Sequence, residues 1–310
     1  MHSPADSFRF PVQLSGIAAS RTLRDSSDGR VAALFESSFY VNTRAGLVCV
    51  GNESLAPSPL TLVTTAPAGT HWPASGLRLN AGVSISARTI GVGNRFVFPL
   101  SEATEWSPDP VPDAWQPLDL ERGVRAFREA AVGRVPTEGL GSFLIPGQRF
   151  ARQRRVCRIA ETPVAALRRC LVTAFREPDK SAMPELQWLH PLVGLGPGLT
   201  PSGDDFIGGM MIALHGLCET DLCRHVWKSV RGYVEEAGNP ISGAHLEAAS
   251  EGQGSAGIHR ALAAILGGCP QATRDSLADI ERIGHVSGWD TMAGVIVTLD
   301  AWLEARHPRA

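Results

Sequence analysis

Up to about residue 100, the chain consists of short apolar runs separated by turn residues. The runs are rich in Val, Ile, Leu, Phe and Thr, and Gly, Pro, Ser and Asn interrupt them. Such runs are typical of strands, and closely spaced runs are typical of hairpins. We predict strands at Val31–Phe35, Ser38–Thr43, Leu47–Val50, Leu60–Thr64, Gly82–Ala87, Thr89–Val92 and Arg95–Pro99. The first part is therefore predicted to be a strand-rich antiparallel barrel or sandwich.

After about residue 115, apolar residues recur every three or four positions instead. Leu167, Cys170, Leu171 and Ala174 illustrate this spacing, which places side chains on one face of an α-helix. We predict helices at Leu118–Val132, Arg154–Arg176, Ala182–Leu189, Asp204–Cys218, Asp221–Glu236, Ile241–Glu251, Gly257–Leu266, Gln271–Ile283 and Trp289–Arg306. The second part is predicted to be an all-helical domain, so the whole chain is predicted to be of the α+β class.

The change of pattern coincides with a proline-rich stretch. Residues 107–117 read SPDPVPDAWQP and contain four prolines. Proline is excluded from the interior of helices and of central strands, so this stretch is predicted to be a linker. We place a strand-rich domain at residues 1–115 and a helical domain at residues 116–310.

Charge and composition restrict the possible partners. The chain has 29 Lys and Arg against 31 Asp and Glu, a net charge of -2, so nucleic acid and anionic lipid are not expected as partners. The longest uncharged apolar run, Phe206–Cys218, is shorter than the roughly 20 residues of a membrane helix. No secretory signal is visible, and the six cysteines form no CxxC pair. We therefore expect a cytoplasmic protein with reduced thiols.

Candidate chemistry is concentrated in residues 194–205, GLGPGLTPSGDD, directly ahead of a predicted helix. Glycines allow a ligand to approach the backbone closely, and the free N–H groups of a helix N-terminus attract anions. The loop lacks the Gly-Lys-Ser/Thr of a phosphate-binding loop and is not GxGxxG, so no nucleotide cofactor is indicated. We predict a small anionic substrate, bound by Gly194, Gly196, Gly198, Thr200, Ser202 and Gly203.

Asp204 and Asp205 follow this loop immediately, and negative charge next to a bound anion is unfavourable without a cation between them. Mg²⁺ suits one or two carboxylates completed by water and substrate oxygens, so it is the candidate cofactor, held by Asp204 and Asp205. The alternative is helix capping, with Ser202 as N-cap and Asp205 three residues later. Capping leaves the second aspartate and the glycines unexplained, so we favour a functional site.

A second passage, residues 284–295, repeats the spacing of the first. Ser287, Gly288, Asp290 and Gly294 correspond to Ser202, Gly203, Asp205 and Gly209. Two helices with the same start and a glycine one turn later can cross closely at that glycine, which would bring both N-termini to a shared site. A weaker third echo is Asn239–His245, which contributes Ser242. Coincidence in a glycine-rich chain is the alternative explanation.

Histidine supplies the remaining candidate chemistry. His285 lies beside the second motif, and with a pKa near 6.5 an unperturbed histidine can transfer a proton or bind a substrate oxygen. A purely structural role is the alternative for any single histidine. The predicted catalytic residues are Asp204, Asp205, His285 and Asp290, and the substrate-binding set also includes Ser242, Ser287 and Gly288.

The string GLGPGLTPSGDDFIGGM, together with NPIS downstream and GHVSGWDTMAGV near the C-terminus, resembles the AllH-like family. The resemblance covers the helical half. It implies association with oxamate carbamoyltransferase, which exchanges oxalurate and phosphate for oxamate and carbamoyl phosphate, and hence protein subunits as partners. It implies no roles for individual residues.

The leading hypothesis is a carbamoyltransferase-type subunit of ureide or nitrogen catabolism that binds a small anionic substrate at the glycine loop, with Mg²⁺. Backbone N–H groups and a hard cation would neutralise the leaving oxygen. Two alternatives stay open: a non-catalytic partner subunit, and a stand-alone Mg²⁺-dependent hydrolase.

Overall fold

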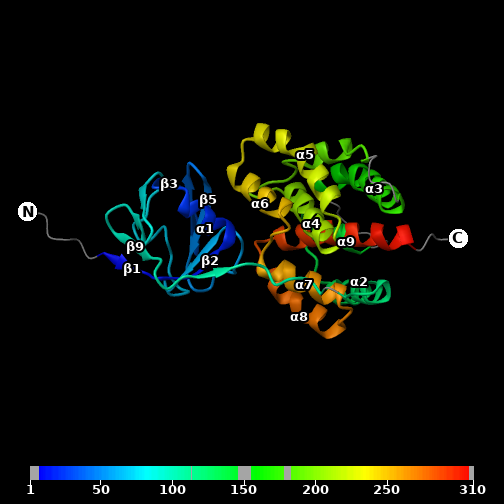
Figure 1. Ribbon diagram of the computed structural model, residues 1–310, viewed down its shortest axis with the longest axis horizontal. Helices are drawn as coiled ribbons and strands as arrows, with labels where there is room; N and C mark the ends of the chain where they lie inside the picture. The colour runs from blue at the N-terminus through cyan, green and yellow to red at the C-terminus, as the bar shows by residue number, and fades with distance from the viewer. Residues whose placement is uncertain (1–6, 113, 146–154, 178–182, 307–310) are drawn as a thin grey trace, which may run out of the picture. The chain divides into compact units, whose positions relative to one another are not determined.

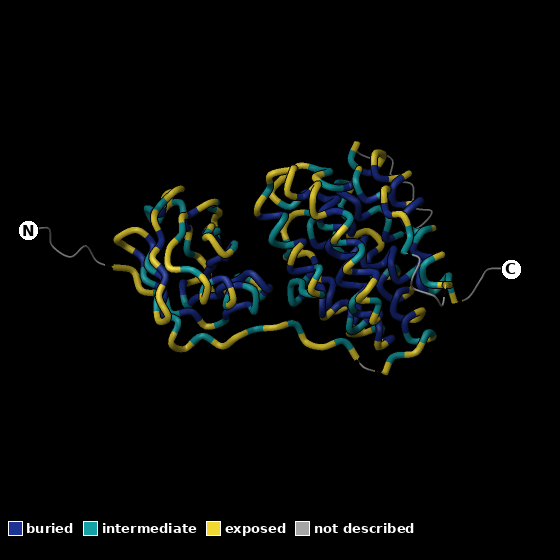
Figure 2. Tube along the Cα trace, turned by 45° about the horizontal axis from the view of Figure 1, so that its top comes forward, coloured by how far each residue is buried: buried dark blue, intermediate teal, exposed yellow. Residues whose placement is uncertain are grey.

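The computed structural model describes residues 7–112, 114–145, 155–177 and 183–306. The chain divides into two compact units, residues 1–108 and 109–310 (Figure 1). Each unit has its own buried interior, shown in dark blue in Figure 2. The strand-rich unit precedes the helical one, so the α+β prediction is confirmed.

The first unit is one curled, ten-stranded sheet in the order β1-β9-β8-β7-β3-β4-β5-β6-β2-β10. One short helix, α1, lies between its second and third strands. The bounds of these elements are β1 Phe8–Arg9, β2 Val12–Gly16, α1 Ile17–Arg24, β3 Asp28–Leu34, β4 Ser38–Thr43, β5 Gly46–Gly51, β6 Thr61–Thr64, β7 Gly82–Ile85, β8 Thr89–Val92, β9 Phe96–Pro99 and β10 Thr104–Trp106.

The sheet is mixed, which corrects the prediction of a purely antiparallel arrangement. Pairs β1–β9, β2–β10 and β5–β6 are parallel, whereas the other pairs of described strands are antiparallel. Parallel neighbours require the chain to cross back rather than turn in a hairpin. Residues 52–60 make this return between β5 and β6.

The second unit is helical. Its elements are α2 Pro117–Ala131, the 3-10 helix η1 Gly141–Leu144, α3 Arg155–Arg176, the 3-10 helix η2 Gln187–Leu192, α4 Ser202–Gly216, α5 Thr220–Ala237, α6 Pro240–Ser250, α7 Ala256–Leu266, α8 Pro270–Glu281 and α9 Ser287–Arg306. No helix among the described residues is long and apolar enough to cross a membrane.

The predicted helix at residues 182–189 is wrong. The described part of this segment is irregular up to Leu186 and then forms the short 3-10 helix η2. Pro184 lies within the predicted helix and Pro191 within η2, and proline removes the N–H that an α-helical hydrogen bond needs.

Two central helices, α4 and α9, form the middle of the helical unit. Both are predominantly apolar and have no continuous polar face, and 13 of the 15 residues of α4 are buried. Helices that are hydrophobic on every side belong in the interior of a domain. In Figure 1, α3, α5 and α6 lie on one side of this pair and α2, α7 and α8 on the other. The pair therefore fixes the positions of the residues at its N-termini.

Candidate functional site

The backbones of α4 and α9 touch where they cross. A Cβ atom added at Gly209 would lie 1.9 Å from the carbonyl oxygen of Thr291, and one added at Gly294 would lie 1.9 Å from that of Phe206. The two contacts are reciprocal, because each motif's glycine meets the residue that follows the other motif's aspartate. The predicted close crossing at these glycines is confirmed. It explains the glycines by packing, since any side chain would separate the helices.

The crossing interlocks the serines and aspartates at the two N-termini. The hydroxyl of Ser202, at the start of α4, interacts with the carboxyl of Asp290 in α9. The hydroxyl of Ser287, at the start of α9, interacts with the carboxyl of Asp205 in α4. Thr200 joins the second pair, with its Oγ1 3.0 Å from Ser287 Oγ. The structure thus brings two segments that are far apart in the chain into one polar cluster.

Capping does not account for this use of Ser202. Helix α4 begins at Ser202, its N-cap position is Pro201, and no side-chain cap hydrogen bond forms there. The Ser202 hydroxyl interacts instead with the other helix, so the Ser-x-x-Asp pattern serves the contact between helices.

The carboxyl of Asp205 is enclosed between the two helices. Burial raises its pKa well above the usual range, while the Ser287 and Thr200 hydroxyls act against that rise. The nearby carboxyl of Asp290 raises the pKa further, because two like charges disfavour ionisation of both. The Oδ2 atom of Asp205 is buried and has no hydrogen-bond partner.

Asp290 is fully buried. Its Oδ1 accepts a hydrogen bond of 2.5 Å from the amide of Leu140, and its Oδ2 is buried without a partner. Burial raises the pKa of this carboxyl to about 6, against the opposite effect of Ser202 and of the amides of Leu140 and Gly141. Each of the interlocked aspartates therefore keeps one unsatisfied oxygen, which is costly in a protein interior.

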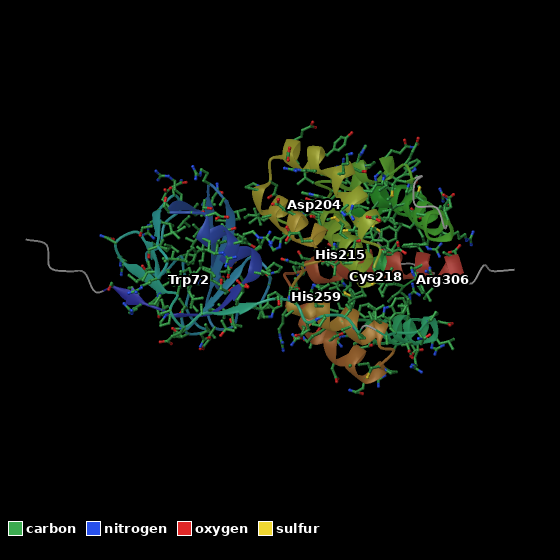
Figure 3. The ribbon with its side chains drawn as sticks, in the orientation of Figure 1. Trp72, Asp204, His215, Cys218, His259 and Arg306 are labelled. Atoms are coloured by element: carbon green, nitrogen blue, oxygen red, sulfur yellow. The ribbon has the colours of Figure 1, made fainter. Side chains whose placement is uncertain are left out.

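Asp204 turns to a different set of partners, although it is adjacent to Asp205 in the chain. Its Oδ1 accepts a hydrogen bond of 2.7 Å from the amide of Gly194, and its Oδ2 accepts one of 2.6 Å from the hydroxyl of Ser242. Burial raises its pKa, and both hydrogen bonds oppose the rise. Asp204, labelled near one end of α4 in Figure 3, thus ties the start of the glycine loop to α6.

The third motif has a positioning role that depends on Asn239. Its side-chain oxygen accepts from the amide of Ser242 at 3.2 Å, which caps α6, and its Nδ2 donates to the carbonyl of Leu199 at 2.9 Å. The sequence singled out Ser242 but not Asn239. A helix-capping asparagine directly before a proline is the signal that identifies it.

The glycines of the loop differ in what they meet. Gly194 and Gly198 have φ values of 69° and 100° with open space where a Cβ would lie. Gly196 packs against Ser202, and Gly203 packs against the carbonyl of Leu192. Gly288, the counterpart of Gly203, packs in the same way against the carbonyl of Ile280. Close packing therefore explains Gly203 and Gly288, while Gly198 lies in the open part of the loop.

Three backbone amides of the glycine loop have no hydrogen-bond acceptor among the described residues. The amides of Gly196, Gly198 and Leu199 donate to no other described residue and remain available for hydrogen bonding.

His285 is exposed on the connection between α8 and α9, and no hydrogen bond or ion pair joins it to a described carboxylate. The structure therefore does not bring His285 together with the aspartates.

Sequence reasoning missed the segment that holds Asp290. Gly139, with φ of 72°, lies so close that an added Cβ would be 2.4 Å from Asp290 Oδ1, and Leu140 donates to that atom. The signal was present, because residues 139–141 repeat the Gly-Leu-Gly of residues 194–196. In both Gly-Leu-Gly segments the first glycine has a positive φ. A backbone amide of each segment donates to a buried aspartate, Leu140 to Asp290 and Gly194 to Asp204.

The described residues contain no group of three or more His, Cys, Asp or Glu side chains arranged to hold a metal ion. Any metal here would therefore depend on two carboxylates with hydroxyl, water or substrate oxygens. The predicted Mg²⁺ on Asp204 and Asp205 stays a prediction, and the two carboxyls face different partners.

Residues 192–299 match the family described as oxamate carbamoyltransferase subunit AllH. The match confirms the resemblance over that segment, about one third of the chain. It begins just before the glycine loop and ends within α9, so it includes Asp204, Asp205 and Asp290. No solved structure matches the chain significantly.

Proposed function

We propose that the protein is a subunit of a carbamoyltransferase-type enzyme and that its helical unit binds a small anionic substrate at the crossing of α4 and α9. The observation that carries the proposal is that residues 192–299, the AllH match, contain both interlocked motifs. The name of that family describes a subunit, so protein partners belong to the proposal.

The chemistry of the cluster suits a carbamoyl compound. A carbamoyl group presents an NH₂ donor and a carbonyl acceptor, and oxamate and oxalurate add a carboxylate. The free amides of Gly196, Gly198 and Leu199 suit the acceptors and the anionic charge. The hydroxyl oxygens of Thr200 and Ser287 suit the NH₂ group. Donors and acceptors therefore lie within one loop and the helices that follow it.

Within this proposal the predicted residues have separate roles. Thr200, Ser202 and Ser287 orient the substrate and the two aspartates, and Asp204 with Ser242 fixes the start of the loop. Gly194, Gly203 and Gly288 permit the backbone geometry. The role of His285, which lies on the exposed connection before α9, stays a prediction.

Ligand-dependent thermal stability tests the proposal. The purified chain is heated with phosphate, carbamoyl phosphate, oxamate, oxalurate or ATP, and a ligand bound only by the folded state raises the melting temperature. At a concentration of about 100 Kd the stabilisation is about 2.7 kcal/mol. We expect a shift with a carbamoyl compound or its product and none with ATP.

Two variants locate the response. Ser287→Ala should reduce it, because it removes the hydroxyl shared by Asp205 and Thr200. Ser250→Ala is the matched control, since that hydroxyl donates only to the Glu247 carbonyl in α6. If no ligand stabilises the chain, substrate binding by this subunit is wrong, and co-purification with a co-expressed neighbour would then test the non-catalytic subunit.

A further inference from the structure

Asp205 and Asp290 place two buried carboxyls together without a basic residue to neutralise them. None of the ion pairs among the described residues involves either side chain. Buried carboxylates are ordinarily paired with a cation or bound to a metal, because an isolated charge in an apolar interior is very unfavourable. The pair therefore requires a positively charged partner if both groups are ionised.

The unused oxygens of the pair are defined atoms. Oδ2 of Asp205 and Oδ2 of Asp290 are buried without hydrogen-bond partners, and Asp290 is fully buried. The fold holds both carboxyls in place, through Ser287 and Thr200 on one side and through Leu140 and Ser202 on the other. A preformed pair of this kind needs little reorganisation to bind a ligand.

We propose that Asp205 and Asp290 together bind one divalent cation of the Mg²⁺ type through their unpartnered Oδ2 atoms. A cation with two positive charges neutralises the two carboxylates. The surrounding donors are hydroxyl oxygens from Thr200, Ser202 and Ser287, and an all-oxygen environment favours hard cations over zinc or copper. Mg²⁺ commonly uses one or two carboxylates and keeps several waters, so the absence of a third described carboxylate ligand is compatible with it.

The proposal differs from the adjacent pair that the sequence suggested. Both oxygens of Asp204 already accept hydrogen bonds from Gly194 and Ser242, and that carboxyl faces α6. Asp290 comes from the other motif and reaches Asp205 only because α4 and α9 cross at their glycines. The cation would lie among the groups that the proposed function assigns to substrate binding. Its binding can nevertheless be measured on this chain by itself, without substrate.

Metal titration of the chelator-treated full chain tests the proposal, with Mg²⁺ followed by calorimetry and Mn²⁺ by electron paramagnetic resonance. We expect one cation per chain. Asp205→Asn and Asp290→Asn should each weaken binding by more than about tenfold, since each removes a charged ligand. Both variants should remain folded by circular dichroism, because asparagine removes a buried charge without changing the side-chain size.

Two further variants make the result specific. Asp204→Asn should weaken binding less than Asp290→Asn does, because its carboxyl serves the loop and α6. Asp221→Asn is the matched control, an aspartate in the first turn of α5 that pairs with Arg224 on the surface. The proposal is wrong if Asp204→Asn abolishes binding while Asp290→Asn does not, or if the wild type binds neither metal.

A measurement on the wild type covers the case in which a variant fails to fold. Bound Mn²⁺ broadens the nuclear magnetic resonance signals of nearby amides. The signals of residues 203–206 and 288–291 should broaden before those of residues 240–243 in α6. Broadening centred on α6, or spread evenly over surface carboxylates, would overturn the proposal. If the chain binds no metal, the substrate proposal is still tested separately by the ligand-dependent melting temperature.

Discussion

Asp204 and Asp205 are neighbours in the chain, yet their carboxyls meet different surroundings. Asp204 has a hydrogen-bond donor for each oxygen, whereas Asp205 and Asp290 each keep an unpartnered one. Successive residues of a helix point in directions about 100° apart, so adjacent side chains reach different neighbours. The pair of aspartates in the sequence is therefore not the pair that faces one ligand.

His259, in α7, shows the opposite case of a buried polar group whose partner is known. Its Nε2 accepts a hydrogen bond of 3.0 Å from the amide of Gly254, so the ring is neutral in the folded state. Burial lowers its pKa from 6.5 to about 4, with a smaller opposite effect of Asp109. Figure 3 labels this side chain in the helical unit.

Acid should therefore weaken the fold through His259. The unfolded chain binds this proton below pH 6.5 and the folded chain only near pH 4, so stability falls as the pH drops through that window. We expect a loss of about 3 kcal/mol, since one pKa unit corresponds to about 1.4 kcal/mol. The measurement is the free energy of unfolding in urea at several pH values.

His259→Gln is the comparison, because glutamine can accept the same hydrogen bond but does not titrate. The difference in unfolding free energy between wild type and variant should shrink toward acid pH and stay constant above about pH 7. A difference independent of pH would contradict this role of His259. The subtraction also removes the opposite contribution of the aspartates with raised pKa values.

At the level of elements, the contact between α4 and α9 depends on the absence of a Cβ atom at two glycines. Gly209 and Gly294 each leave room for the carbonyl of the facing helix. That closeness brings Ser202 to Asp290 and Ser287 to Asp205. Helix packing and site geometry are thus set by the same contact.

Gly209→Ala should be strongly destabilising, because its Cβ would lie 1.9 Å from the Thr291 carbonyl oxygen and would push the helices apart. We expect a loss of more than about 2 kcal/mol, at the upper end of overpacking effects. Chemical denaturation followed by circular dichroism gives the value.

Gly232→Ala is the matched control, because this glycine lies within α5 with open space around it. Alanine there should stabilise the helix by about 0.5–1 kcal/mol, the usual advantage over glycine. Equal effects of the two substitutions would show that α4 and α9 do not meet at Gly209.

At the scale of the whole molecule, the two units have separate hydrophobic cores. The core of the first unit runs from Val12 to Phe98, and that of the second from Leu120 to Trp302, with no residue in common. A unit with its own core is able to fold alone. The crossing of α4 and α9 and every residue of the proposed cation site belong to the second unit.

Residues 109–310 should therefore fold when expressed alone. We expect a helical circular dichroism spectrum and one cooperative thermal transition, because the buried helices α4 and α9 are complete within this segment. Gradual melting without a cooperative transition would mean that the second unit needs the first for its stability.

The sequence alone determined most of the elements and the existence of the two motifs. Strong periodicity located the long helices to within a few residues, because an apolar stripe must be buried wherever the helix packs. It did not reveal β1, β2, β10 or α1, since elements of two to eight residues are too short to establish a period. Matching glycines also predicted the crossing of α4 with α9, because only close packing demands them at that spacing.

Tertiary structure decided which groups meet and which are left without partners. The connection from Gly139 to Gly141 reaches Asp290 across 150 positions, and Asp204 turns to Ser242 while Asp205 faces Ser287. His285 remains outside this cluster. Spacing along a chain fixes the face of a helix on which a residue lies, but the partner depends on how helices cross. The unpartnered oxygens of Asp205 and Asp290 therefore emerge only from the folded structure.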